Sequence, residues 1–90
     1  MDPIQKVIDD VARRFGVEHE SLLVSRDHDI CALKHYAMYL ARQRTKATHK
    51  ELGEAFGCHY SNTINAVAKV KKKAKAGQLE AWLQRMGWRG

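Results

Sequence analysis

The residues of this sequence with the most evident chemical potential form a short polar run between positions 60 and 65. Tyr60 is followed by Ser61, Asn62, Thr63 and, after one apolar residue, Asn65. An asparagine amide can pair with adenine through two hydrogen bonds, and serine or threonine hydroxyls can bond to base edges or phosphates. The run therefore predicts contacts to DNA bases from the first turns of an exposed helix. The alternative is that Ser61 and Asn62 only cap that helix.

Basic residues follow and surround this polar run. No acidic residue lies between Ser61 and Gly77, and five lysines do: Lys69, Lys71, Lys72, Lys73 and Lys75. Lysines at consecutive positions surround a helix, so only some of them can face one duplex. We expect phosphate contacts from a wider basic set: Lys34, Arg42, Lys46, Lys50, His59, Lys69, Lys72 and Lys73. A run of lysines is also common on a plain solvated surface.

The positive charge is unevenly distributed along the chain. The 90 residues carry a net charge of +6, but positions 1–20 hold five acidic residues against three basic ones. The other 70 residues hold thirteen basic residues against five acidic ones. A neutral-to-acidic start and a basic body indicate a core-forming leader followed by a face for a polyanion.

The elements that must position these residues are helices, because apolar residues recur at helical spacing and no strand-like alternation occurs. Asp2 and Pro3 predict the start of a first helix, which Gly16 ends. A turn over residues 18–23 is expected to place Leu22 and Leu23 in the core. Asp27 or Asp29 can cap a longer helix that runs to about Arg44. Its expected buried stripe is Ile30, Leu33, Ala37, Leu40 and Ala41, with Lys34, Arg42 and Arg44 facing outward.

A helix-turn-helix is predicted over about residues 48–75. Thr48 to Glu51 form a capping box, which opens a short helix that Gly57 ends. After a tight connection, Ser61 can cap a helix to about Lys75, with an expected apolar stripe of Ile64, Val67, Val70 and Ala74. A last helix would place Leu79, Trp82, Leu83 and Met86 on one side. The chain is thus expected to be a single all-α DNA-binding domain over 1–90, with about five helices.

Three segments of the chain resemble a known family. They are the apolar pattern from Val7 to Leu23, the AMYLAR block at residues 37–42 and the ELGEAFG block at residues 51–57. Together they resemble the C-terminal DNA-binding domain of the bacterial replication initiator DnaA, a relative of the Trp repressor fold. The resemblance extends from about Ile4 to Val70.

The resemblance implies roles for four residues. Arg26 lies in the family's basic loop, at the place of the arginine that enters the minor groove, and so joins the expected base-reading residues. Lys34 and Arg42 lie at basic positions of the following helix that hold the DNA backbone. Thr63 matches the last threonine of the family's Asp-His-Thr-Thr signature.

The chain departs from the family where bases are read. Residues 60–63 are Tyr-Ser-Asn-Thr in place of the signature, and Cys58-His59 replace the preceding Gly-Arg. Asp27 and Asp29 also dilute the basic loop. We therefore expect the fold and groove geometry to be kept while a different DNA sequence is read. The chain lacks the GxxxxGK[ST] phosphate loop of an ATP-driven initiator, and it cannot act as an initiator alone.

Metal binding and catalysis are disfavoured. His28, Cys31 and His35 share one predicted helix face, but a structural zinc site needs a fourth ligand and chance co-facing is the simpler interpretation. Cys58 and His59 are adjacent, with no orienting acid, which does not make a nucleophile and base. We expect a protein without enzymatic activity, metal or cofactor.

Two further function classes stay open beside a DNA reader. Trp82, Met86 and Trp88 can form a seam for a protein partner or for self-association, as in an adaptor that does not touch DNA. More often such a stripe docks onto the core of its own chain. A ligand-gated repressor resembling the Trp repressor is the third class, and it would require a dimer.

The expected setting is the cytoplasm of a bacterium, or of a bacterial cell infected by a virus. No apolar run approaches the ~20 residues of a membrane span. The two cysteines form neither a CxxC pair nor a disulfide framework, which favours a reducing compartment. The sequence thus predicts a stand-alone, nucleoid-associated DNA-binding regulator of transcription or replication.

Overall fold

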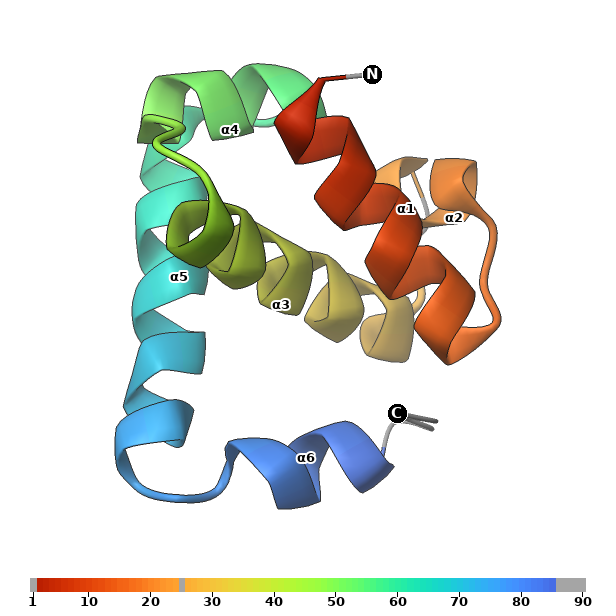
Figure 1. Ribbon diagram of the computed structural model, residues 1–90, viewed down its shortest axis with the longest axis vertical. Coiled ribbons are helices and arrows are strands. Elements are labelled where there is room, and N and C mark those ends of the chain that lie inside the picture. Colours follow the sequence, from red (N-terminus) through yellow and green to blue (C-terminus); the bar gives the residue numbers. More distant parts are fainter. Residues whose placement is uncertain (1, 25, 86–90) are drawn as a thin grey trace.

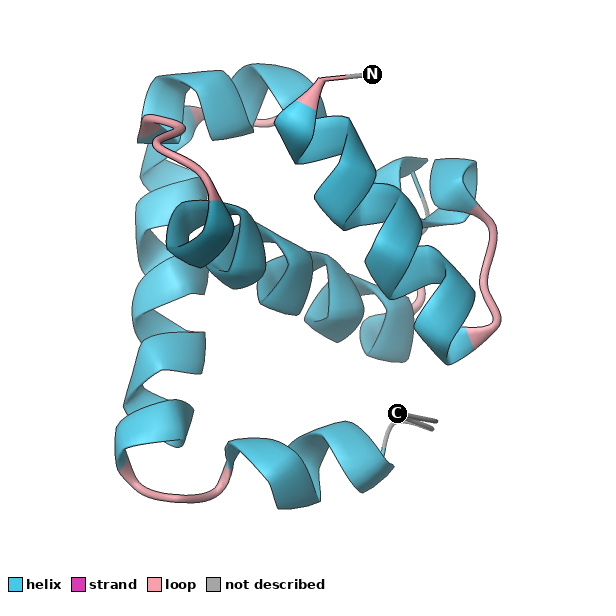
Figure 2. Cartoon of the chain, viewed as in Figure 1, coloured by secondary structure: helices cyan, strands magenta, loops and turns pink. Residues whose placement is uncertain are grey.

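The computed structural model describes residues 2–24 and 26–85, and within these ranges the chain is helical without strands. The helices are α1 (Pro3–Phe15), α2 (His19–Val24), α3 (His28–Arg44), α4 (His49–Phe56), α5 (Tyr60–Lys75) and α6 (Leu79–Arg85). Figures 1 and 2 show them joined by short loops. The expected all-α fold with a helix-turn-helix is confirmed. The segment expected as a turn after Gly16 is instead the short helix α2, which buries Leu22.

Helix α3 lies at the centre of the arrangement. It packs against α1 and α2 on one side and against α5 on the other, while α4 packs against α5 and touches α1. Figure 1 shows α5 running the length of one side and α6 turning back beneath α3. The largest fully buried side chains come from all five of the first helices: Ile8, Val11, Leu22, Met38, Leu52, Phe56 and Val70.

Local signals set most helix ends as predicted. The Asp2 carboxylate accepts a hydrogen bond from the Ile4 amide at 2.8 Å, and Gly16 ends α1 in the left-handed region at φ +68°. Thr48 and Glu51 form both hydrogen bonds of the capping box. For α3 the structure selects Asp27 as the cap, since its carboxylate accepts from the amides of residues 29 and 30.

The buried stripe of α3 is broader than predicted. Tyr36 and Met38 are buried in addition to Leu33, while Ile30 and Leu40 are only half-buried. A central helix has neighbours on more than one side, and its buried surface therefore exceeds a single amphipathic stripe.

Candidate nucleic-acid interface

Helices α4 and α5 approach each other closely at Gly53. A Cβ atom built at Gly53 would lie 2.6 Å from the carbonyl oxygen of Cys58 and 3.3 Å from the amide nitrogen of Tyr60. Only a glycine lets the backbone of the turn pack against α4 at this distance. Gly57 then takes φ +70°, which reverses the chain between the two helices.

The N-terminus of α5 is capped by His59, where Ser61 had been predicted. The Nδ1 atom of His59 accepts a hydrogen bond from the Ser61 amide at 3.1 Å, and it lies 2.9 Å from the Ser61 hydroxyl oxygen. An accepting Nδ1 means that the proton of the neutral ring is on Nε2, which leaves one donor for another partner. The imidazole also contacts the ring of Tyr60, with the two centroids 4.3 Å apart and the ring planes tilted by 34°. These contacts fix the start of the helix.

Thr63 lies inside the protein, and its predicted contact to a base does not fit this position. Its side chain is 0% exposed. Its hydroxyl donates to the Tyr60 carbonyl at 2.7 Å and lies 3.3 Å from the His49 carbonyl and 3.1 Å from Nδ1 of His49. Thr63 therefore joins α5 to α4 and does not belong to the exposed side chains that could read bases.

The side of α5 that is buried differs from the predicted one, which is why Thr63 is buried rather than exposed. The buried line runs through Thr63, Ala66 and Val70. The predicted stripe shared only Val70 with this line, because Ile64 is 44% exposed and Val67 is half-buried. This face of α5 packs against α3 and α4, and Thr63 on it bonds to the His49 carbonyl of α4, which an isoleucine could not do.

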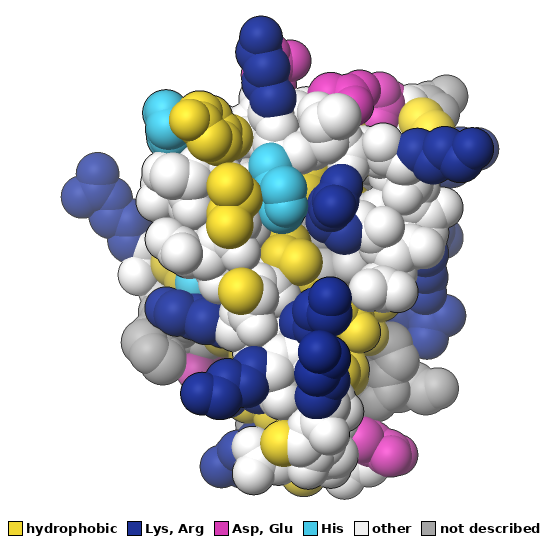
Figure 3. Space-filling view, turned by 90° about the vertical axis from the view of Figure 1, so that its left-hand side faces the viewer, with side chains coloured by type: hydrophobic (Ala, Val, Ile, Leu, Met, Phe, Trp, Pro, Cys, Tyr) yellow, Lys and Arg dark blue, Asp and Glu magenta, His cyan; other side chains and the backbone are white. Residues whose placement is uncertain are grey.

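The other predicted base-reading side chains of α5 are exposed together on its first two turns. Tyr60 is 51% exposed, and Ser61, Asn62 and Asn65 are exposed as well. Helical spacing continues this exposed surface through Lys69 and Lys72. Figure 3 looks onto this side of the molecule, where Lys and Arg side chains gather and acidic side chains lie at the margins.

One flank of α5 forms a cavity of about 310 Å³ with α3. It is lined by Cys31, Lys34, His35, Met38, Cys58, Asn62, Asn65, Ala66 and Lys69, with no carboxylate among them. Burial, together with the positive charges of Lys69 and Lys34, lowers the pKa of His35. With Lys34 and Lys69 and no carboxylate in its lining, the cavity carries positive charge, as a phosphate site would require.

Two of the predicted phosphate-binding residues also stabilise the fold. Lys34 is half-buried, and its Nζ atom donates to the carbonyl oxygen of Leu23 at 3.2 Å. Arg42 is exposed, and its Nη1 atom donates to the carbonyl oxygen of Ala47 at 2.7 Å. Lys34 thus ties α3 to the end of α2, and Arg42 ties α3 to the loop before α4.

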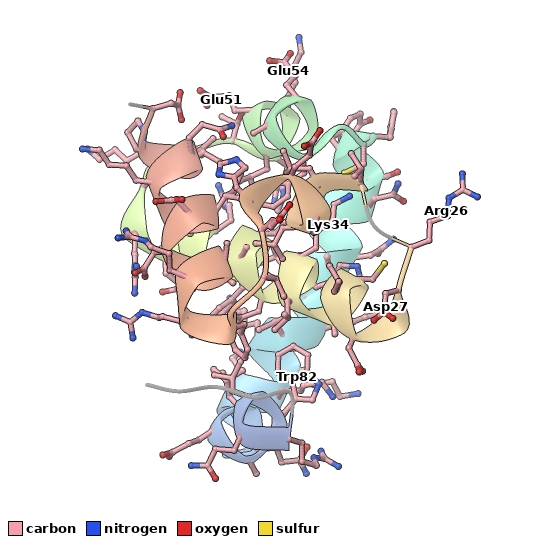
Figure 4. All side chains as sticks on the ribbon, turned by 90° about the vertical axis from the view of Figure 1, so that its right-hand side faces the viewer. Arg26, Asp27, Lys34, Glu51, Glu54 and Trp82 are labelled. Carbon is pink, nitrogen blue, oxygen red and sulfur yellow. The ribbon has the colours of Figure 1, made fainter. Side chains whose placement is uncertain are left out.

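The remaining predicted cations are not equivalent. Arg26, Lys46, Lys50, Lys69 and Lys72 are exposed, and Figure 4 shows Arg26 projecting away from the helices. Lys73 is half-buried, and its Nζ atom lies 5.5 Å from the centroid of the Trp82 ring. Its charge therefore faces α6 rather than open solvent.

Helix α6 docks onto the core of its own chain. The ring of Trp82 meets Tyr36 edge to face at 6.4 Å, and Leu83 is buried. Figure 4 shows Trp82 at the junction of α6 with the helices above it. Of the predicted partner seam, Trp82 is thus half-buried in an intramolecular contact, while Met86 and Trp88 lie outside the described residues.

No three His, Cys, Asp or Glu side chains in the described part of the chain come together as a metal site would need, although the His28 side chain is not among those described. None of the helices described is long and apolar enough to span a bilayer.

A short capped helix, a glycine turn and a second helix with exposed polar and basic side chains define a helix-turn-helix domain of the DNA-binding class. The family described as the bacterial DnaA protein helix-turn-helix matches residues 4–70, and the chain belongs to this family. DNA binding in this general sense comes with the family, whose helix-turn-helix unit is a binding domain rather than a catalytic one.

Curated relatives agree with this assignment. The chromosomal replication initiator protein DnaA of Thermus thermophilus is 34% identical over 77 residues, which cover 83% of this chain and 17% of that protein. The corresponding protein of Thermotoga maritima is 32% identical over 84 residues, covering 90% of this chain and 19% of that protein. The chain thus spans less than a fifth of the length of these relatives. No solved structure matches it significantly.

Proposed function

We propose that this domain recognises a specific sequence of double-stranded DNA by inserting the first turns of α5 into the major groove. The observation that carries the proposal is the joint exposure of Ser61, Asn62 and Asn65 at the capped end of that helix. Asparagine amides suit adenine, and the serine hydroxyl suits a base edge or phosphate. Thr63, on the buried side of α5, holds this surface in position through its contact to the His49 carbonyl of α4.

Cations on both sides of α5 would hold the DNA backbone. Lys69 and Lys72 continue the exposed surface of α5. Lys46 is exposed in the loop before α4, and Lys50 is exposed on α4 itself. The hydrogen bonds of Lys34 and Arg42 to backbone carbonyls hold these two cations at fixed positions. The Nε2–H of His59 is a further donor to a phosphate, and Arg26 would enter the neighbouring minor groove. In a bacterial cell such a domain would act on the nucleoid, as a regulator of transcription or replication.

Fluorescence anisotropy tests the proposal with a DnaA-box duplex and a shuffled duplex at several salt concentrations. Since residues 60–63 differ from the family signature, we expect salt-sensitive binding without preference for the box. Selection from a randomised pool should then yield the preferred sequence. Absence of binding to either duplex near ~100 mM salt would overturn the proposal, because non-specific DNA binders commonly show measurable affinity there.

The placement of the recognition helix has its own test. Asn62→Ala should reduce discrimination between the selected and shuffled duplexes by about 1–3 kcal/mol, the range for one well-placed bidentate contact. Gln84→Ala is the matched control, because it removes an exposed amide from α6. If Asn62→Ala left affinity and preference unchanged, α5 would not be the reading helix.

A further inference from the structure

Large apolar side chains are exposed at few places in the described part of the chain. They are Val24 at 70%, Tyr60 at 51% and Ile64 at 44% exposure. Tyr60 and Ile64 are four residues apart on α5 and therefore lie on one side of the helix, one turn from each other. This apolar pair lies on the surface proposed to face DNA. Apolar residues scattered at random over the surface would not gather there, so the pair points to an apolar contact with the DNA.

The fold does not require an isoleucine at position 64. The buried line of α5 runs through Thr63, Ala66 and Val70, and Ile64 lies beside it. Ile64 instead lines a hollow of about 320 Å³ together with Val67 and Ala68, and with Arg42, His49 and Lys71 among the polar side chains around them. A hollow that combines apolar side chains with two cations fits a small apolar group that is flanked by negative charge.

DNA offers such a group in its major groove. The 5-methyl group of thymine is apolar, lies at the groove surface and has phosphates on both sides. The absence of acidic residues from α5 and the cations Arg42 and Lys71 favour this polyanion over an apolar patch on a protein. Building on the proposed function, we propose that Ile64, with the ring of Tyr60, is a specificity-determining contact to the 5-methyl group of a pyrimidine.

The proposal distinguishes the methyl group from the hydrogen-bonding edge of the base. Asn62 and Asn65 can read adenine through its hydrogen-bonding atoms, whereas Ile64 can read only the methyl group on a pyrimidine. The same methyl group occurs on thymine and on 5-methylcytosine, so the experiment tests both bases as carriers of the methyl group that Ile64 would contact.

The experiment uses the duplex selected from the randomised pool. Each thymidine is replaced in turn by deoxyuridine, which removes the methyl group and leaves the hydrogen-bonding atoms unchanged. We expect at least one position to lose affinity about fourfold, the factor that corresponds to one buried methyl-sized group. In the second arm each cytosine is replaced by 5-methylcytosine. A gain of affinity there, without loss on the uracil duplexes, would identify methylated cytosine as the source.

Ile64→Ala tests whether this residue makes the contact to the methyl group. The variant should bind the thymine duplex more weakly and should no longer distinguish it from the uracil duplex. Val24→Ala is the matched control, because it trims an exposed apolar side chain on α2 and should keep the full methyl effect. Circular dichroism should show unchanged helix content for both variants.

Two results would overturn the inference while leaving the proposed function intact. One is salt-sensitive, sequence-selective binding by the wild-type protein with no effect of any methyl group. The other is a methyl effect of the same size in Ile64→Ala. If the wild-type protein bound no duplex, the proposed function would fail, and this inference would fail with it.

Discussion

The side-chain hydroxyl of Thr63 on α5 lies 3.1 Å from Nδ1 of His49 on α4, and it also donates to the carbonyl oxygen of Tyr60. One buried hydroxyl thus connects α4 to the first turn of α5. Thr63 lies within the polar run of residues 60–65, yet its contacts make it a positioning residue.

Substitution of Thr63 tests this role. Thr63→Val keeps the shape of the side chain but removes the hydroxyl, which leaves the buried partners without their hydrogen bonds. We expect the free energy of unfolding to fall by about 1–3 kcal/mol in urea denaturation. Thr63→Ser is the control, because it keeps the hydroxyl. A Thr63→Val protein of normal stability that selects a different DNA sequence would show that Thr63 reads a base.

Gly53→Ala tests the close approach of α4 and α5. The added Cβ would lie 2.6 Å from the Cys58 carbonyl oxygen, and the backbone of the turn would have to move. We expect a loss of about 1–3 kcal/mol, as for other overpacked sites, although alanine is the better helix former by about 1 kcal/mol. Thermal unfolding measures the change.

Gly57→Asn is the matched control for that substitution. At Gly57 a Cβ atom would meet nothing within 4 Å, and the strain comes only from φ +70°, which asparagine tolerates better than other residues. A Gly53→Ala protein as stable as the wild type would mean that the two helices are not in close contact at this point.

Acidification should destabilise the fold through His49. Burial, aided by the positive charge of Arg42, lowers the pKa of His49 in the folded state below its ordinary value of 6.5. The unfolded chain therefore takes up a proton at higher pH than the folded chain, and the free energy of unfolding falls as pH drops through 6.5 towards the folded-state pKa. Urea denaturation at about pH 7.5 and about pH 5.5 measures the fall.

His49→Gln should flatten this dependence without abolishing it, because the pKa of His35 is lowered by burial and by neighbouring lysines in the same direction. Stability that stayed constant or rose on acidification of the wild-type protein would contradict the prediction.

Lys72 and Lys73 form a matched pair of neighbouring cations with different surroundings. Lys72 is exposed, whereas the ammonium of Lys73 lies over the Trp82 ring. Lys72→Gln should reduce the slope of log affinity against log salt by about 0.9, the value for one phosphate contact. Lys73→Gln should change this slope less and should cost about 0.5–1 kcal/mol of stability through the lost cation–π contact. Equal slope changes for the two variants would show that both lysines contact phosphates.

Much of this protein follows from short-range patterns in the sequence. The caps at Asp2 and Thr48 and the glycine stops at Gly16 and Gly57 act between residues a few positions apart, and for this reason they could be predicted. The blocks at residues 37–42 and 51–57 indicated the family in the same way. His59 as a cap was missed because its ring nitrogen acts in place of the usual serine, although the contact is local.

The rotation of α5 about its own axis follows from contacts with other helices rather than from its apolar pattern. Thr63 and Ile64 are neighbours, and composition favours burial of the isoleucine, yet the threonine is buried and the isoleucine is largely exposed. The reason is non-local: the Thr63 hydroxyl lies 3.3 Å from the His49 carbonyl oxygen on α4, a polar contact that an isoleucine cannot make. The internal hydrogen bonds of Lys34 and Arg42 and the docking of Trp82 likewise join separate elements. Local sequence patterns indicated five of the six described helices and the family, and packing between helices decided which side chains of α5 are exposed.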